Sequence, residues 1–149
     1  MESDHPRGLR GRIWKILLRI PKVDVDEYLA LVQKKDQTLY RSICNDTFRS
    51  FGKDYKFRER VPDAKLIRTV SALVQYCKSI KSPIGYIQAM SKLIAPFLYV
   101  MPEADAFFCF RRFALCCCPS YFMPNIPGVF GGLAVCLYHF PFLHPFLFA

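Results

Sequence analysis

The sequence predicts a single all-α domain, and three observations support that prediction. Apolar residues recur at helical spacing along most of the chain, whereas no stretch alternates convincingly between polar and apolar residues. Glycine is scarce, with 7 residues in 149, so little material exists for glycine-rich phosphate loops or repetitive β-architectures. A hydrophobic fraction of 52% excludes general disorder, and a chain of this length can bury a real core.

The first part of the chain predicts three helices. Residues 10–20 are expected to form a short amphipathic helix that Pro21 ends. Asp24 is placed to cap a second helix, and a third runs roughly from 39 to 51, closed by Gly52. Residues 54–60 are polar and are expected to be irregular.

The clearest helix follows residue 62, with Asp63 as its N-cap. A turn over residues 83–85 precedes a further helix that begins near Tyr86 and is bent by Pro96. Another helix is expected over residues 103–117. The prolines at 119, 124 and 127 predict an extended loop after it, and a last apolar run begins at 129. The wide apolar stripe of the clearest helix consists of Leu66, Ile67, Val70, Leu73, Val74 and Cys77.

The net charge of +9 favours an anionic partner: nucleic acid, an acidic membrane surface or an acidic protein face. The basic residues are spread through every predicted helix before residue 113, and no nucleic-acid signature appears. We therefore expect no nucleic-acid partner. Solvated helix faces are the default interpretation, with attraction to an acidic protein or an anionic membrane as a secondary role.

The seven cysteines have no regular spacing and include no CxxC pair. Three adjacent cysteines at 116–118 cannot all point at one tetrahedral centre, so we predict buried thiols and no metal site. Basic residues interrupt the N-terminus where a signal peptide would need an apolar run. A reducing cytosol is the expected compartment.

The chain changes composition abruptly at Arg112, because residues 113–149 contain no Lys, Arg, Asp or Glu. Three interpretations stay open: the core-facing part of a domain whose remainder is missing, a C-terminal membrane segment, or a mistranslated end. Residues 128–149 are long enough to span a bilayer, but two prolines and two histidines interrupt them. A core-facing or truncated end is favoured.

Three short motifs follow one another along the chain. Residues 10–14 read RGRIW, with Arg10 four positions before Trp14. Residues 43–49 read ICNDTFR, with the spacing IxxDxxR, and residues 85–90 read GYIQAM, with the spacing YxQ. In this order and at these separations the motifs resemble the TBC domain, an all-helical module that stimulates GTP hydrolysis by Rab-family GTPases.

The stretches NDTFRSF (45–51), LIR (66–68) and APFLY (95–99) are similar to the subgroup found in fungal mitotic-exit and septation checkpoints. The resemblance covers about residues 8–137. A TBC domain usually has around 200 residues by resemblance, so residues 1–149 are expected to be its N-terminal two-thirds, ending in the uncharged residues 113–149. The fold implied is an irregular helical array.

The resemblance implies that Arg49 is an arginine finger and Gln88 a glutamine finger, both inserted into the active site of a partner GTPase. A guanidinium supplied in trans neutralises charge on the transferring phosphoryl oxygens, an effect on the order of 10³ to 10⁵ in rate. A carboxamide can accept from the attacking water and donate to phosphate together. Lysine would substitute poorly for Arg49, because an ammonium group cannot span two phosphate oxygens.

Supporting roles follow from the same resemblance. Asp46, three residues before Arg49 on a helix, is expected to orient the finger, although N-terminal capping is an equal alternative. Tyr86 is expected to brace the turn that presents Gln88. Arg10 and Trp14 match a motif that is mostly structural. Ala89 departs from the glycine usual in the family; its methyl group is costly at positive φ and harmless in ordinary helix.

The resemblance implies a GTPase-activating protein, possessing no cofactor of its own, whose partner GTPase holds GTP and Mg²⁺. Expected locations are the cytoplasm and, through partners, spindle poles or endomembranes. Two alternatives stay open: a catalytically inactive truncated module that binds a GTPase or a scaffold protein, and a protein anchored to a membrane by its C-terminus. The activator is not itself a hydrolase, and truncation would leave it inactive under the first alternative.

Overall fold

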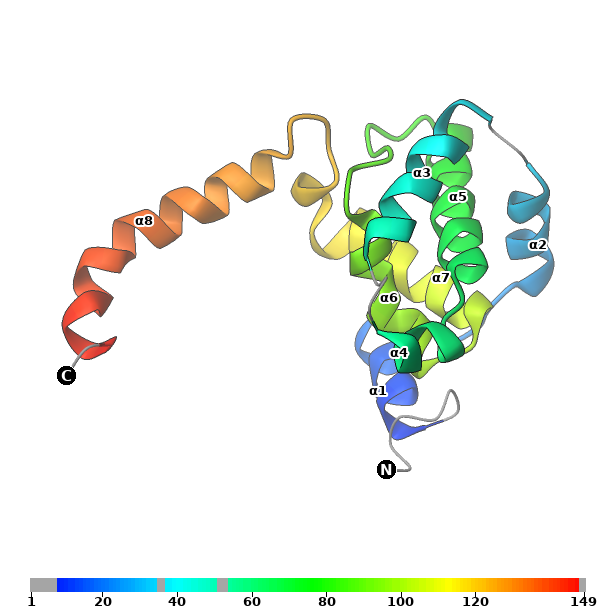
Figure 1. The fold of residues 1–149 in the computed structure, drawn as a ribbon, viewed down its shortest axis with the longest axis horizontal. Coiled ribbons are helices and arrows are strands. Elements are labelled where there is room, and N and C mark those ends of the chain that lie inside the picture. Colours follow the sequence, from blue (N-terminus) through cyan, green and yellow to red (C-terminus); the bar gives the residue numbers. More distant parts are fainter. Residues whose placement is uncertain (1–7, 35–36, 51–53, 148–149) are drawn as a thin grey trace.

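The computed structural model describes residues 8–34, 37–50 and 54–147, and these form an all-α structure without strands (Figure 1). The predicted fold class is therefore confirmed. The helices are α1 (Leu9–Leu17), α2 (Val25–Gln33), α3 (Gln37–Ser50), α4 (Tyr55–Arg60), α5 (Asp63–Ser79), α6 (Met90–Val100), α7 (Glu103–Arg112) and α8 (Pro127–Leu147).

Helix α5 is the centre of the packed body, since it contacts α2, α3, α6 and α7 (Figure 1). The predicted stripe lies on its inner faces: Leu66 and Val70 are fully buried, and Leu73 and Cys77 are each only 1% exposed. Aromatic rings fill the space between α6 and α7, where Phe97 and Phe110 meet edge-on at 5.5 Å between centroids. Burial of such side chains is the main stabilising contribution to the body.

Helix α1 packs closely against the end of α6. A Cβ added at Gly11 would lie 2.6 Å from the Val100 carbonyl oxygen, so this approach requires glycine. The helix ends at Leu17, before the end predicted at residue 20, because Arg19 adopts a left-handed conformation with φ 55°. Asp24 caps α2 as predicted: its carboxylate accepts a hydrogen bond from the Glu27 amide at 3.0 Å.

The prediction of irregular structure at residues 54–60 was wrong, because these residues include α4. The Asp54 carboxylate accepts from the Phe57 amide at 2.9 Å and so caps the helix. Asp63 is not the N-cap of α5 but lies in its first turn, where it pairs with Arg58 at 3.0 Å. Gly52, predicted to close the third helix, lies outside the described residues.

Two other predicted boundaries were wrong. The sixth helix begins at Met90, whereas Tyr86 lies in a non-helical segment that the site described below holds in place. The helix after residue 103 is α-helical only to Arg112 and continues as a π-helical turn, Phe113–Cys117, followed by a 3-10 turn, Pro119–Tyr121.

Helix α8 extends away from the body (Figure 1) and packs chiefly against the 3-10 turn. In its first half Phe130 is 64% exposed, and Leu133 and Val135 are more than half exposed. Within the described ranges, the helices are too short or too polar to cross a membrane.

Candidate functional site

The last turns of α3 are attached to the start of α6 through a buried hydroxyl pair. Thr47 and Ser91 are 1% and 0% exposed, and their side-chain oxygens lie 2.8 Å apart. Each hydroxyl satisfies the other, so both groups can be buried without losing a hydrogen bond. Ile43, one turn earlier on α3, is buried on the same face. This contact fixes the position from which Arg49 projects.

Asp46 joins α3 to the segment that carries Gln88. Its Oδ2 accepts one hydrogen bond from the Ala89 amide at 2.7 Å and another from the Tyr86 hydroxyl at 3.1 Å. Hydrogen bonds to an ionised carboxylate are stronger than those between neutral groups. The two donors flank Gln88 on either side, so one carboxylate holds the whole turn.

The Tyr86 hydroxyl keeps its proton under ordinary conditions. Burial, together with the charge of Asp46 and the hydrogen bond to it, raises the pKa of Tyr86 to about 12. The phenol therefore remains a donor to Asp46 at neutral pH. A protonated Tyr86 hydroxyl that donates to Asp46 is the contact expected of a residue that supports the Gln88 turn.

Ala89 has the backbone conformation for which glycine is normally used. Its φ is 69° and its ψ is 9°, which is the left-handed region, and it forms the N-cap position of α6. For a residue with a Cβ this conformation costs roughly 1–2 kcal/mol. Of the two alternatives left open for Ala89, the structure therefore supports positive φ, and the methyl group is unfavourable here.

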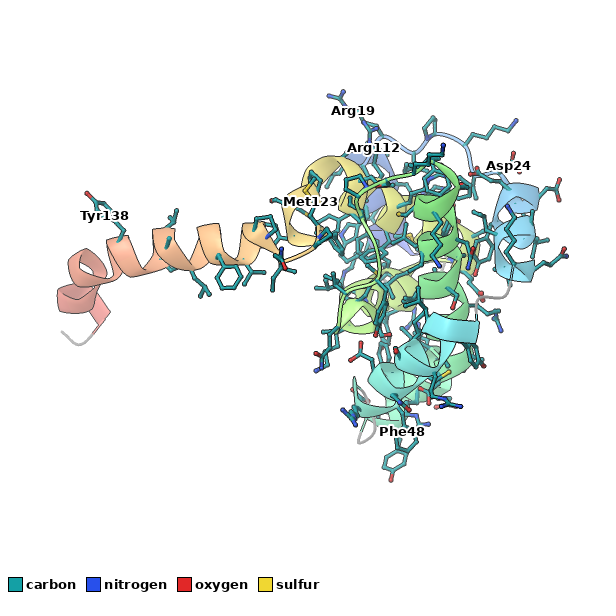
Figure 2. The ribbon with its side chains drawn as sticks, turned by 90° about the horizontal axis from the view of Figure 1, so that it is seen from above. Arg19, Asp24, Phe48, Arg112, Met123 and Tyr138 are labelled. Carbon is teal, nitrogen blue, oxygen red and sulfur yellow. The ribbon has the colours of Figure 1, made fainter. Side chains whose placement is uncertain are left out.

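Arg49 and Gln88 are both exposed. Arg49 is in the last turn of α3, one turn after Asp46, and Gln88 directly precedes the amide that Asp46 binds. The structure thus presents a guanidinium and a carboxamide on two adjoining, hydrogen-bonded segments. Phe48, beside Arg49 in sequence, projects from the body at the end opposite Arg19 and Arg112 (Figure 2) and is 73% exposed.

The first motif lies on α1. Trp14 is half-buried and meets Phe97 edge-on at 5.1 Å, so it attaches α1 to α6 as a packing residue. Arg10 is exposed and lines a cavity of about 510 Å³ between α1, α4 and α6. Neither residue takes part in the contacts around Asp46 described above.

Sequence reasoning missed two features of this region. The Thr47–Ser91 pair could have been suspected, because Thr47 follows the apolar Ile43 at helical spacing. The cavity beside Arg10 could not have been suspected, because α4 forms one of its walls and residues 54–60 were not expected to be helical.

The cysteines match the prediction only in part. Cys77 and Cys109 are buried, and burial raises the pKa of these thiols to about 11 and about 12 respectively. Cys116, Cys117 and Cys136 are exposed, so the prediction of buried thiols was wrong for them. Among the residues that the structure describes, no group of three or more His, Cys, Asp or Glu could hold a metal ion.

The all-α body carries the three motifs on α1, on α3 and on the segment just before α6. The model of the family described as the Rab-GTPase-TBC domain matches residues 7–148, and the chain belongs to this family. The resemblance stated from the three motifs is therefore confirmed. No solved structure matches the chain.

Three relatives indicate the subgroup. The chain is 40% identical over 122 residues to a protein of Dictyostelium discoideum described as a mitotic check point protein BUB2, covering 82% of this chain and 32% of the relative. It is 35% identical over 135 residues to cell division control protein 16 of Schizosaccharomyces pombe, covering 89% and 44%. It is 31% identical over 143 residues to mitotic check point protein BUB2 of Saccharomyces cerevisiae, covering 88% and 47%.

The chain thus spans between about a third and a half of the length of these relatives. The predicted similarity to mitotic-exit and septation checkpoint proteins is confirmed.

Proposed function

We propose that this chain stimulates GTP hydrolysis by a small Rab-like GTPase, in control of mitotic exit or septation, with Arg49 and Gln88 supplied in trans. The observation that carries the proposal is the Asp46 carboxylate, which bonds to the amide next to Gln88 from a position one helical turn before Arg49. Membership of the Rab-GTPase-TBC family and similarity to the checkpoint relatives support the same function.

The two side chains have complementary tasks. The Arg49 guanidinium stabilises negative charge that develops on the γ-phosphoryl oxygens, and its planar fork can donate two parallel hydrogen bonds. The Gln88 carboxamide accepts from the attacking water while its amino group donates to a phosphate oxygen. GTP and Mg²⁺ belong to the partner, so the chain contributes positioning and electrostatics without a cofactor of its own.

Exposure is a requirement of this mechanism. A finger must leave its own domain and enter the partner's site, so it cannot be held by a buried network of its own. The residues that do the holding, Asp46 and Tyr86, are half-buried, whereas Arg49 and Gln88 are exposed. The supporting groups are thus separated from the reacting groups, which keeps the latter accessible.

The test is single-turnover GTP hydrolysis by a panel of small Rab-like GTPases, with and without the chain. Stimulation of at least one GTPase well above its intrinsic rate is expected, at concentrations where complex formation is also measured. Binding of a GTPase with turnover at the intrinsic rate would instead identify a non-catalytic module. That second candidate is favoured by one observation: the apolar side chains of Phe130, Leu133 and Val135 in α8 are exposed rather than packed.

A further inference from the structure

The cavity between α1, α4 and α6 has the composition of a recognition pocket. Its volume is about 510 Å³, and aromatic rings line it together with three cationic side chains. We call it the α6 pocket. Its lining consists of Arg10, Trp14, Asp54, Lys56, Phe57, Lys92, Ala95, Pro96, Tyr99 and Val100.

The aromatic wall of the α6 pocket is firmly held. Phe57 of α4 and Tyr99 of α6 stack almost in parallel, with an interplanar angle of 8° and centroids 5.8 Å apart. The Arg60 guanidinium lies 4.2 Å from the Tyr99 ring centroid. A pocket whose walls are already packed loses little conformational entropy when a partner enters it.

The charge of the α6 pocket favours an acidic partner. Its cations outnumber its one carboxylate, Asp54, which also caps α4. Lys56 and Lys92 are exposed, and neither forms an ion pair with a carboxylate of the described residues. Pro96 has no N–H, so the Lys92 carbonyl lacks its usual helical donor and is left as an acceptor beside the pocket.

Lys92 connects the lining of the α6 pocket to the segment that carries Gln88. Lys92 donates its backbone N–H to the Ala89 carbonyl at 2.9 Å, so it lies one helical turn after the residue next to Gln88. One turn of helix advances by about 5 Å. A protein that receives Gln88 in its active site therefore comes within about one helical turn of Lys92, which lines the pocket.

We infer that the α6 pocket is a second docking point for the GTPase, and that it takes a segment of that partner with a carboxylate beside an apolar side chain. The carboxylate would lie between Lys56 and Lys92, and the apolar group against Phe57 and Tyr99. This inference rests on the proposed function for the identity of the partner. It assigns Lys56 and Lys92 to affinity and leaves the chemical step to Arg49 and Gln88.

The experiment compares Lys56→Glu/Lys92→Glu with the wild type and with Lys22→Glu, an exposed lysine between α1 and α2. Dissociation constants are measured for the GTPase loaded with a non-hydrolysable GTP analogue, at two salt concentrations, together with single-turnover rates at saturation. Thermal unfolding verifies that each variant is folded. Phosphatidylcholine vesicles containing a quarter phosphatidylserine test an anionic membrane as the alternative occupant.

We expect the double variant to weaken binding about tenfold at low salt, with a smaller loss at high salt and a saturating rate within twofold of the wild type. Lys22→Glu should bind like the wild type. An unchanged dissociation constant overturns the inference, as does loss of vesicle binding alone, and neither affects the proposed function. Weakened binding of a GTPase whose hydrolysis is never stimulated would keep the inference and overturn the proposed catalysis.

Discussion

Two carboxylates in this molecule each accept a hydrogen bond from a tyrosine, but their other donors differ. Glu103 accepts from Tyr28 at 2.6 Å and from both arms of Arg68, at 2.9 and 2.8 Å, so it is fully paired within the body. Asp46 accepts from Tyr86 and from the backbone amide of Ala89. The first network holds α2, α5 and α7 together, whereas the second fixes a backbone turn.

The difference explains where stability and function reside. The Glu103 network uses its arginine internally, and the bidentate pair is one of the stronger arrangements available to a carboxylate. The Asp46 network includes a backbone amide from the turn that carries Gln88, and both Arg49 and Gln88 are exposed to a partner. Changes at the first network should affect unfolding, and changes at the second should affect turnover.

The largest effect is expected for Arg49→Ala. Loss of the guanidinium should reduce stimulated hydrolysis on the order of 10³-fold or more, because the charge that develops at the phosphoryl oxygens then loses its cationic partner. Single-turnover rates at saturating chain concentration measure this. Arg49→Lys should recover only a small part of the rate, since an ammonium group donates as a point charge. Full activity in either variant removes Arg49 from the mechanism.

Gln88→Ala should give the next largest effect, about 10²-fold in the same rate. The side chain is exposed, so the thermal unfolding temperature should stay close to that of the wild type. Gln88→Glu is the matched control, because it preserves size but cannot donate to phosphate through an amino group. A Gln88→Ala variant as fast as the wild type would exclude the glutamine-finger role.

Glu103→Gln tests the other side of the comparison through stability. Burial tends to raise the pKa of Glu103, but hydrogen bonds from Arg68 and Tyr28 prevail and hold it below its ordinary value of 4.5. A lowered pKa in the folded state means that the contribution is fully present above pH 4.5 and is lost as pH falls through the folded pKa.

At pH 7 the Glu103→Gln variant should therefore be destabilised by about 1–2 kcal/mol. The gap to the wild type should close as pH falls from 4.5 through the lowered pKa of folded Glu103, as followed by denaturant unfolding at each pH. Saturating hydrolysis at pH 7 should stay within about twofold of the wild type, since this network does not touch the Asp46 turn. A gap that widened in acid would contradict the assignment.

Ala89→Gly should produce the smallest change, and in the favourable direction. Glycine removes the strain of the left-handed conformation, so stability should rise by about 1 kcal/mol and the unfolding temperature by about 2–4 °C. Ala30→Gly, at an exposed position within α2, is the matched control and should lower stability by a similar amount. Equal losses in both variants would show that Ala89 is not strained.

Much of the fold could be predicted from periodicity, because α5 and α6 bury wide apolar faces at helical spacing. The cap at Asp24 followed from its residue type alone. Helix α4 could not be predicted, since its six residues carry little apolar pattern. It depends on the Asp54 cap and on Phe57 packing against Tyr99. Tertiary contacts decided that element.

The candidate site was predictable only through its motifs. No local pattern distinguishes Arg49 from other helix arginines, and Gln88 reads as an ordinary polar residue. The hydrogen bonds to Asp46 join residues forty or more positions apart, which spacing alone cannot bring together, and nothing in the local pattern indicates the left-handed backbone at Ala89. The α6 pocket could not be predicted for the same reason, because its lining comes from three helices that are separated in the sequence.

The central claim is that Asp46 acts on turnover by holding the turn that presents Gln88. A double-mutant cycle between Asp46→Asn and Gln88→Ala, followed by single-turnover hydrolysis at saturation, measures this directly. We expect Asp46→Asn alone to slow hydrolysis about tenfold, and to have little further effect once Gln88 is Ala. Losses that multiply independently in the double variant would contradict the claim.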